Sequence, residues 1–143
     1  MQFAVALDRV IAAPRTKVYR AWLDPTMLAR WFGPDDFSVV VATVDERVGG
    51  VHQVEMLNPD GGHTTFVSTI EELIPDERIV FRFKFDPEGD ESKLTLTFAD
   101  SESGGTALRL EHERLISEGT FNGDSVNVGW GQTLAKLQTY VET

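Results

Sequence analysis

The sequence of 143 residues is long enough for one domain with a sizeable core, since 41% of its residues are hydrophobic. Its formal net charge of -10 at pH 7 disfavours binding to nucleic acid or to anionic membranes, because the long-range field would repel both. The absence of cysteine excludes disulfides, thiolate catalysis and cysteine-based zinc sites. We therefore expect a single domain over residues 1–143 with no nucleic acid partner, no membrane insertion and no cofactor. The start of the chain lacks the pattern of a signal peptide, which predicts a cytoplasmic protein.

The first part of the chain predicts one strand followed by two short helices. Residues 2–11 alternate loosely between apolar and polar side chains and contain no helix-start signal, as a strand does. Pro14 suits the first turn of a helix, which we expect to run for about ten residues. Asp24 suits the N-cap of a second helix that has a proline at its first position, and Gly33 ends it.

From Phe37 onward, apolar runs separated by turn-forming segments predict six antiparallel strands joined by short turns. The alternation is clearest where Ile79, Phe81 and Phe83 are separated by single residues, which indicates a sheet covered on one face only. The same alternation turns His52 and His112 toward the covered face. With helices gathered on that face, the order of elements predicts an α+β domain.

The last predicted element is a long amphipathic helix over residues 126–141. Its apolar residues recur in steps of three and four: Val126, Trp130, Leu134, Leu137 and Val141. Glycines lie in or beside this helix at positions 123, 129 and 131, and each one inside it costs about 1 kcal/mol relative to alanine. Two interpretations follow, namely a close approach of helix and sheet, or space kept for a ligand.

Three stretches resemble a known family: Val18–Pro34 (VYRAWLDPTMLARWFGP), Val44–Met56 (VDERVGGVHQVEM) and Gly129–Val141 (GWGQTLAKLQTYV). Together they resemble the Hsp90-ATPase-activator (AHSA1) C-terminal-like family of the START/Bet v 1-like superfamily, over nearly the whole chain. The resemblance implies a helix-grip fold, in which a curved seven-stranded antiparallel sheet wraps a long C-terminal helix and two short helices follow the first strand. It also implies a mostly apolar cavity between the sheet and the long helix.

The main hypothesis is a domain that binds a small apolar or aromatic molecule in this cavity. Its candidate ligand-binding residues face the space between sheet and helices: Trp31, Phe32, His52, Val54, Met56, Phe66, Phe81, Phe83, Leu96, Leu108, Leu110, His112, Trp130 and Leu134. The sequence does not identify the ligand, and it leaves a homodimer open.

Two alternatives remain at this point. One is an enzyme like the polyketide cyclases and dehydratases, with His52 or His112 as the acid or base, because imidazole exchanges protons near neutral pH. The other is an interaction domain like the Hsp90 co-chaperone. If Glu71 or Glu72 met the two histidines, the three side chains could also satisfy the donor requirements of a metal ion, but no spacing motif supports this and we expect no metal site.

Overall fold

The structure is a computed structural model that describes residues 2–119 and 121–143. The elements follow in the order β1 (Gln2–Ile11), α1 (Arg15–Ala21), α2 (Pro25–Trp31), β2 (Ser38–Val44), β3 (Val51–Leu57), β4 (His63–Ile74), β5 (Arg78–Lys84), β6 (Ser92–Asp100), β7 (Thr106–Ile116) and α3 (Gly123–Val141). This order confirms the prediction of one strand, two short helices, six strands and a long helix.

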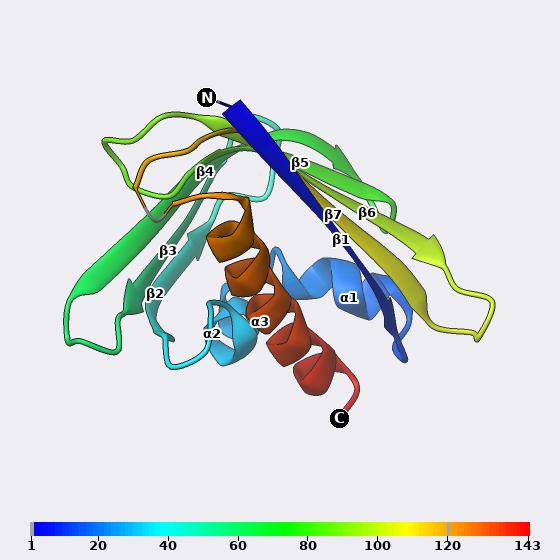
Figure 1. Cartoon of the computed structure of the whole chain (residues 1–143). Coiled ribbons are helices and arrows are strands. Elements are labelled where there is room, and N and C mark those ends of the chain that lie inside the picture. The colour runs from blue at the N-terminus through cyan, green and yellow to red at the C-terminus, as the bar shows by residue number, and fades with distance from the viewer. Residues whose placement is uncertain (1, 120) are drawn as a thin grey trace.

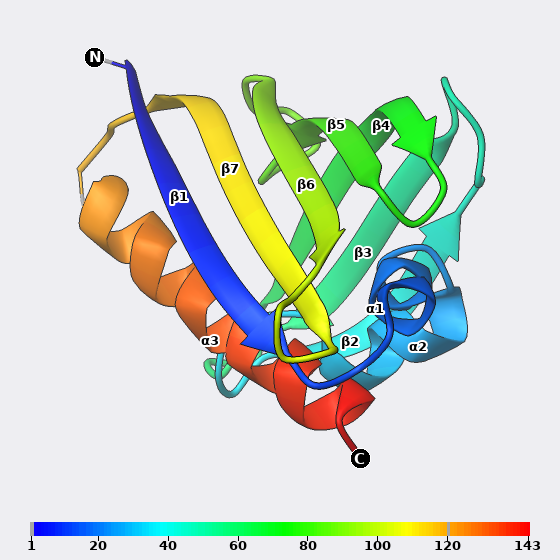
Figure 2. The same ribbon diagram turned by 90° about the vertical axis from the view of Figure 1, so that its right-hand side faces the viewer.

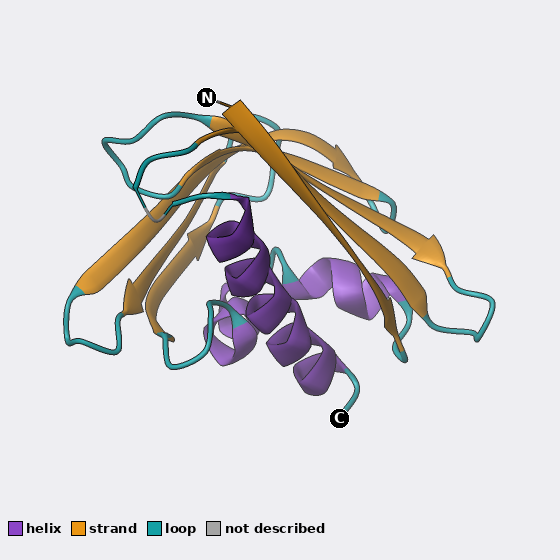
Figure 3. Cartoon of the chain, in the orientation of Figure 1, coloured by secondary structure: helices purple, strands orange, loops and turns teal. Residues whose placement is uncertain are grey.

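The strands form one antiparallel sheet in the order β1-β7-β6-β5-β4-β3-β2. Each strand from β2 to β7 pairs with its neighbour in sequence. Strand β1 pairs with β7 and forms the edge of the sheet opposite β2. The sheet is strongly curved, and all three helices lie on its concave side, with α3 crossing the opening of the arch (Figures 1 and 2). Coloured by element type, the chain shows one sheet layer over one helix layer (Figure 3), which is the predicted α+β helix-grip fold.

The apolar core lies between the concave face and the helices. In β5, Ile79, Phe81 and Phe83 are almost fully buried and Arg82 is exposed, as the alternation predicts, but Val80, expected on the exposed face, is buried as well. From α3, the buried side chains are Val126, Trp130, Thr133, Leu134, Leu137 and Val141. Every apolar residue used to predict the helix therefore lies on its buried face. None of the helices in the described part of the chain has the length and apolar character needed to cross a bilayer.

The two short helices are tied together by aromatic packing and caps. The Asp24 carboxylate accepts hydrogen bonds from the backbone N–H groups of Thr26 (2.8 Å) and Met27 (3.3 Å), which confirms the predicted N-cap of α2. The Trp31 indole donates to the Ala21 carbonyl at the end of α1 (3.1 Å). Helix α1 spans 7 residues, shorter than predicted, because the chain turns at its end so that α2 can begin.

Helix α3 begins at Gly123, three residues before the predicted start. Asn122 is its N-cap: the side chain accepts from the Ser125 backbone N–H (3.1 Å), and the Ser125 hydroxyl accepts from the Asn122 backbone N–H (3.0 Å). This capping box satisfies two backbone donors at the helix start. The apolar period alone could not locate this start, because Gly123 and Asp124 add no apolar side chain to the helix face.

Replacing Asn122 by alanine is expected to lower the free energy of unfolding by about 1 kcal/mol, because the cap hydrogen bond to Ser125 is lost at an exposed helix end. Urea unfolding followed by circular dichroism would measure the change. Replacing Asn122 by aspartate keeps the acceptor and should restore most of the stability. Equal stability of the alanine variant and the wild type would contradict this role.

Candidate functional site

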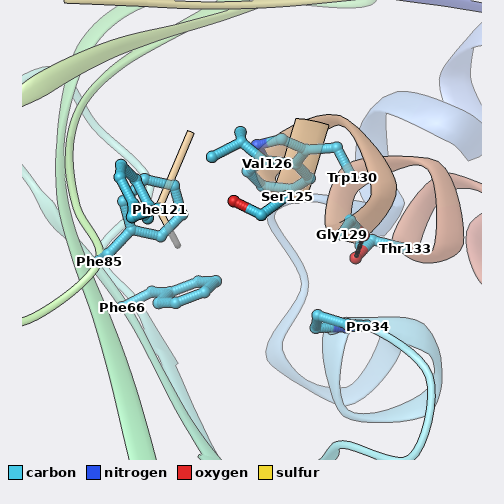
Figure 4. A pocket seen from close by; sticks show the side chains of 9 residues that line it. All are labelled: Pro34, Phe66, Phe85, Phe121, Ser125, Val126, Gly129, Trp130 and Thr133. Atoms are coloured by element: carbon cyan, nitrogen blue, oxygen red, sulfur yellow. Dashed lines mark hydrogen bonds between the residues drawn. The ribbon is translucent and has the colours of Figure 1, made fainter. Parts of the chain in front are cut away.

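A pocket of about 230 Å³ lies between the first half of α3 and the concave face of the sheet. Its lining comes from the loop after α2, from β4, from the residue after β5, from the segment before α3 and from α3 itself (Figure 4): Pro34, Phe66, Phe85, Phe121, Ser125, Val126, Gly129, Trp130 and Thr133. Ser125 is exposed, whereas Trp130 and Thr133 are buried, so the pocket runs inward from the surface at the start of α3. We call it the outer pocket.

Four of the nine residues that line the outer pocket are aromatic, and the three phenylalanines among them meet edge to face. The Phe85 ring lies 5.2 Å from that of Phe66 and 5.1 Å from that of Phe121, measured between centroids. Behind them, Phe83 packs on Phe66 at 5.2 Å and on Trp130 at 5.9 Å. Rings arranged in this way offer both faces and edges to a guest, which suits an apolar or aromatic molecule.

The hydroxyl groups of this lining already have partners. Ser125 donates to the Asn122 carbonyl (3.0 Å), and Thr133 donates to the Gly129 carbonyl one turn earlier in α3 (2.8 Å). The outer pocket therefore selects by shape and by apolar contact, and its two hydroxyls mainly serve the helix.

The glycines of α3 are not required by close packing. A Cβ at position 129 would meet its nearest non-local atom, Pro34 Cγ, at 4.0 Å, which is ordinary van der Waals contact. At position 131 the nearest atoms would lie at 3.9 Å, and at position 123 also at 3.9 Å. Because alanine would fit and would favour the helix, the contacts around Gly129 support the interpretation that glycine leaves space there.

His112 holds the inner wall of the outer pocket through a chain of hydrogen bonds. The Trp130 indole, which can only donate, donates to His112 Nδ1 (3.0 Å), so the imidazole proton lies on Nε2. That nitrogen donates to the Ser92 hydroxyl (2.7 Å), and Ser92 donates to the Phe83 carbonyl (2.9 Å). The direction of every hydrogen bond in this series follows from its two ends, an indole that can only donate and a carbonyl that can only accept.

Burial lowers the pKa of His112 to about 3, from 6.5 for a free histidine, because the charged form loses its hydration. The side chain is fully buried, and Phe85 stacks on the imidazole at 5.2 Å. A neutral imidazole with both nitrogens occupied orients Trp130. It has no free position for taking or giving a proton at neutral pH.

His52 lies at the other side of the core. Its Nε2 donates to the Trp22 carbonyl (2.8 Å) and so joins β3 to the end of α1. Burial lowers its pKa as well, because the protonated ring would be desolvated. Like His112, it is a neutral histidine that links elements of the fold.

The acidic residues Glu71 and Glu72 do not join the histidines. Glu72 pairs with Arg78 (Oε1 to Nε, 3.3 Å) at the surface, and Glu71 is exposed. A β-bulge between Ile70 and Glu72 shifts the pairing of β4 with β5, so the inward alternation ends there. Within the described residues, no group of three histidine, aspartate or glutamate side chains is placed to hold a metal ion.

The structure brings together only some of the predicted site residues. Phe66 and Trp130 line the outer pocket. Phe32, His52, Phe81 and Phe83 line a small inner cavity of about 10 Å³, together with Trp22, Ser68 and Leu94. The remaining predicted residues are buried in the core: Trp31, Val54, Met56, Leu96, Leu108, Leu110, His112 and Leu134.

Several lining residues were absent from the predicted set: Pro34, Phe85, Phe121, Ser125, Val126, Gly129 and Thr133. Phe85 continues the inward alternation of β5, and Val126 belongs to the apolar face of α3, so both carried a usable signal. Phe121 follows β7 in a segment without periodicity and carried none.

Comparisons with known proteins agree on one family. The sequence profile of "Activator of Hsp90 ATPase homolog 1-like protein" matches residues 12–142. The solved structure of protein CV1439 from Chromobacterium violaceum is 34% identical, with 99% of each chain covered and a TM-score of 0.84. The AHSA1-like protein from Aeromonas hydrophila is 26% identical, covering 98% of this chain and 92% of that one, with a TM-score of 0.81. No curated protein matches the sequence.

Proposed function

The chain belongs to the family of Activator of Hsp90 ATPase homolog 1-like proteins, and on that premise we propose that it binds a small apolar or aromatic molecule in the outer pocket. The observation that carries the proposal is a recess of about 230 Å³ whose lining includes Phe66, Phe85, Phe121 and Trp130. Ligand sites are typically concave and mostly apolar, with few polar groups.

The size of the outer pocket limits the ligand. Pockets for drug-sized ligands usually have a volume of roughly 300–1,000 Å³, and the outer pocket is smaller. A compound of one or two fused rings fits this volume. The chemical class is further limited by charge, because the protein carries a net charge of -10 and no cationic side chain lines the pocket. These features disfavour an anionic ligand.

The residues that line the outer pocket favour ligand binding over acid–base catalysis. An acid–base mechanism needs a titratable group within hydrogen-bond reach of the substrate, and the lining contains none. Both of the histidines considered, His52 and His112, are neutral and hydrogen-bonded inside the core. No contact in the described residues favours the co-chaperone alternative.

Replacing Gly129 by leucine is expected to weaken binding of naphthalene at least about tenfold, because the new side chain would occupy the outer pocket. Heteronuclear NMR titration of the labelled protein would give Kd and show which residues shift. Val128→Leu is the matched control, since Val128 is adjacent on α3 and 58% exposed. Its Kd should equal that of the wild type. The proposal fails if naphthalene causes no shifts at the pocket, or if Gly129→Leu binds as tightly as the wild type.

A further inference from the structure

The indole N–H of Trp22 is a buried donor that lacks a partner. Trp22 is 1% exposed, and its Nε1 makes no hydrogen bond within the described residues. The other two indoles are satisfied, Trp31 by the Ala21 carbonyl and Trp130 by His112. Buried polar groups in folded proteins almost always have partners, so an unsatisfied one next to a void points to a missing acceptor.

The side chain that carries this donor also lines the inner cavity. It is lined by Trp22, His52 and Ser68 among apolar side chains, and its volume of about 10 Å³ is roughly that needed for one oxygen-sized group such as water. Ser68 is 2% exposed and brings a hydroxyl group to the same lining. An indole N–H without a partner and a neutral hydroxyl thus belong to the lining of one small void.

The inner cavity and the outer pocket are separated by aromatic side chains. Phe66 lines the outer pocket, and its ring lies 6.0 Å from that of Phe32 and 5.2 Å from that of Phe83. Phe32 and Phe83 line the inner cavity. Phe66 is half-buried whereas Phe32 and Phe83 are buried, so Phe66 is the least enclosed of the three rings between the two spaces.

We propose that the inner cavity is the polar end of the ligand site, and that it accepts the neutral carbonyl oxygen of a ligand whose apolar body fills the outer pocket. This inference rests on the proposed function and extends it to the class of ligand, a flat aromatic ketone or a similar neutral carbonyl compound. The Trp22 indole and the Ser68 hydroxyl donate to that oxygen.

The charge of the lining selects a carbonyl over a carboxylate. No cationic side chain lines the inner cavity, and a buried carboxylate without a cation is strongly disfavoured. Without ligand, one water molecule fits the same place. A ligand carbonyl reproduces the hydrogen bonds that this water accepts, whereas an apolar group of the same shape displaces it without replacing them.

The test uses two probes of equal shape, 2-acetylnaphthalene, which carries a C=O, and 2-isopropenylnaphthalene, which carries a C=CH2. Wild-type protein is expected to bind the ketone about tenfold tighter than the alkene, the factor that one net hydrogen bond supplies. Trp22→Phe keeps an aromatic ring without the donor, and it should reduce the ratio of the two Kd values to near one, mainly by weakening the ketone. Ser68→Ala should reduce the ratio partly, and Gly129→Leu should weaken both probes together.

A second measurement needs no substitution at Trp22. In ¹⁵N-labelled wild type, the ketone should move the indole resonance of Trp22 downfield, and the alkene should not. The indole resonances of Trp31 and Trp130, both already hydrogen-bonded, are internal references. The inference is overturned if wild type binds the two probes equally, or if the Trp22 resonance responds to both alike. If neither probe binds, the proposed function fails and the inference with it. Equal binding of both probes refutes the inference alone.

Discussion

Lowering the pH from 7 to 4 is expected to reduce the free energy of unfolding by about 3 kcal/mol through His112 alone. The folded pKa of His112 is about 3, against 6.5 for the free side chain. Between these two pH values His112 is protonated in the unfolded chain and neutral in the folded chain, so acid favours unfolding. The loss begins as the pH falls below 6.5 and is complete below the folded pKa. Burial also lowers the pKa of His52, which adds a loss of the same sign.

Urea unfolding at pH 7, 5 and 4 would measure this loss. In His112→Gln the amide keeps a donor and an acceptor inside the core but gains no proton in this range, so its stability should fall less steeply with acid than that of the wild type. His63→Gln, at an exposed imidazole paired with Glu55, controls for the exchange of imidazole for amide. The same pH dependence in His112→Gln and wild type would contradict the assignment.

Replacing Trp130 by alanine is expected to lower the free energy of unfolding by about 3–5 kcal/mol, the usual loss when a buried tryptophan becomes alanine. Trp130 is 4% exposed and contacts the rings of Trp22, Phe32 and Phe83. The substitution also removes the hydrogen bond that His112 Nδ1 accepts, and no other described residue donates to this buried nitrogen.

Trp130→Phe separates these two contributions. It keeps most of the apolar contact and removes only the indole donor, so a loss of about 1–3 kcal/mol is expected. Denaturant unfolding of wild type and both variants, followed by far-UV circular dichroism, would give the values. If Trp130→Phe were as stable as wild type, the hydrogen bond to His112 would contribute nothing, and if Trp130→Ala lost less than Trp130→Phe, the packing argument would be wrong.

The fold could be predicted from the sequence because its signals are local. Alternation in β5 identifies the buried face, Asp24 identifies the start of α2, and the steps of three and four from Val126 identify the buried face of α3. Each signal reflects backbone geometry that holds wherever the element packs. The sequence also contains a signal for the start of α3, because Asn122 and Ser125 have the spacing of a capping box.

The site could be predicted only in part, because a side chain that points toward the core does not always line a cavity. Leu96, Leu108 and Leu110 do point inward, and they are buried among other apolar side chains of the core. Whether a side chain meets empty space depends on how far α3 stands from each strand, which no local pattern encodes. Phe121 reaches the outer pocket from a segment whose position depends on where β7 ends.

The pairing of β1 with β7 has a consequence for biosynthesis. Val5 lies opposite His112, so β1 is synthesised more than a hundred residues before the strand with which it pairs. Strands β2 to β7 can meanwhile form as successive hairpins, because each pairs with the strand just made. Helices α1 and α2 are made earlier and can cover part of the apolar face, but the part under α3 stays uncovered until α3 is translated, because α3 follows β7. The nascent protein is therefore most prone to aggregate in the interval between β7 and the end of α3.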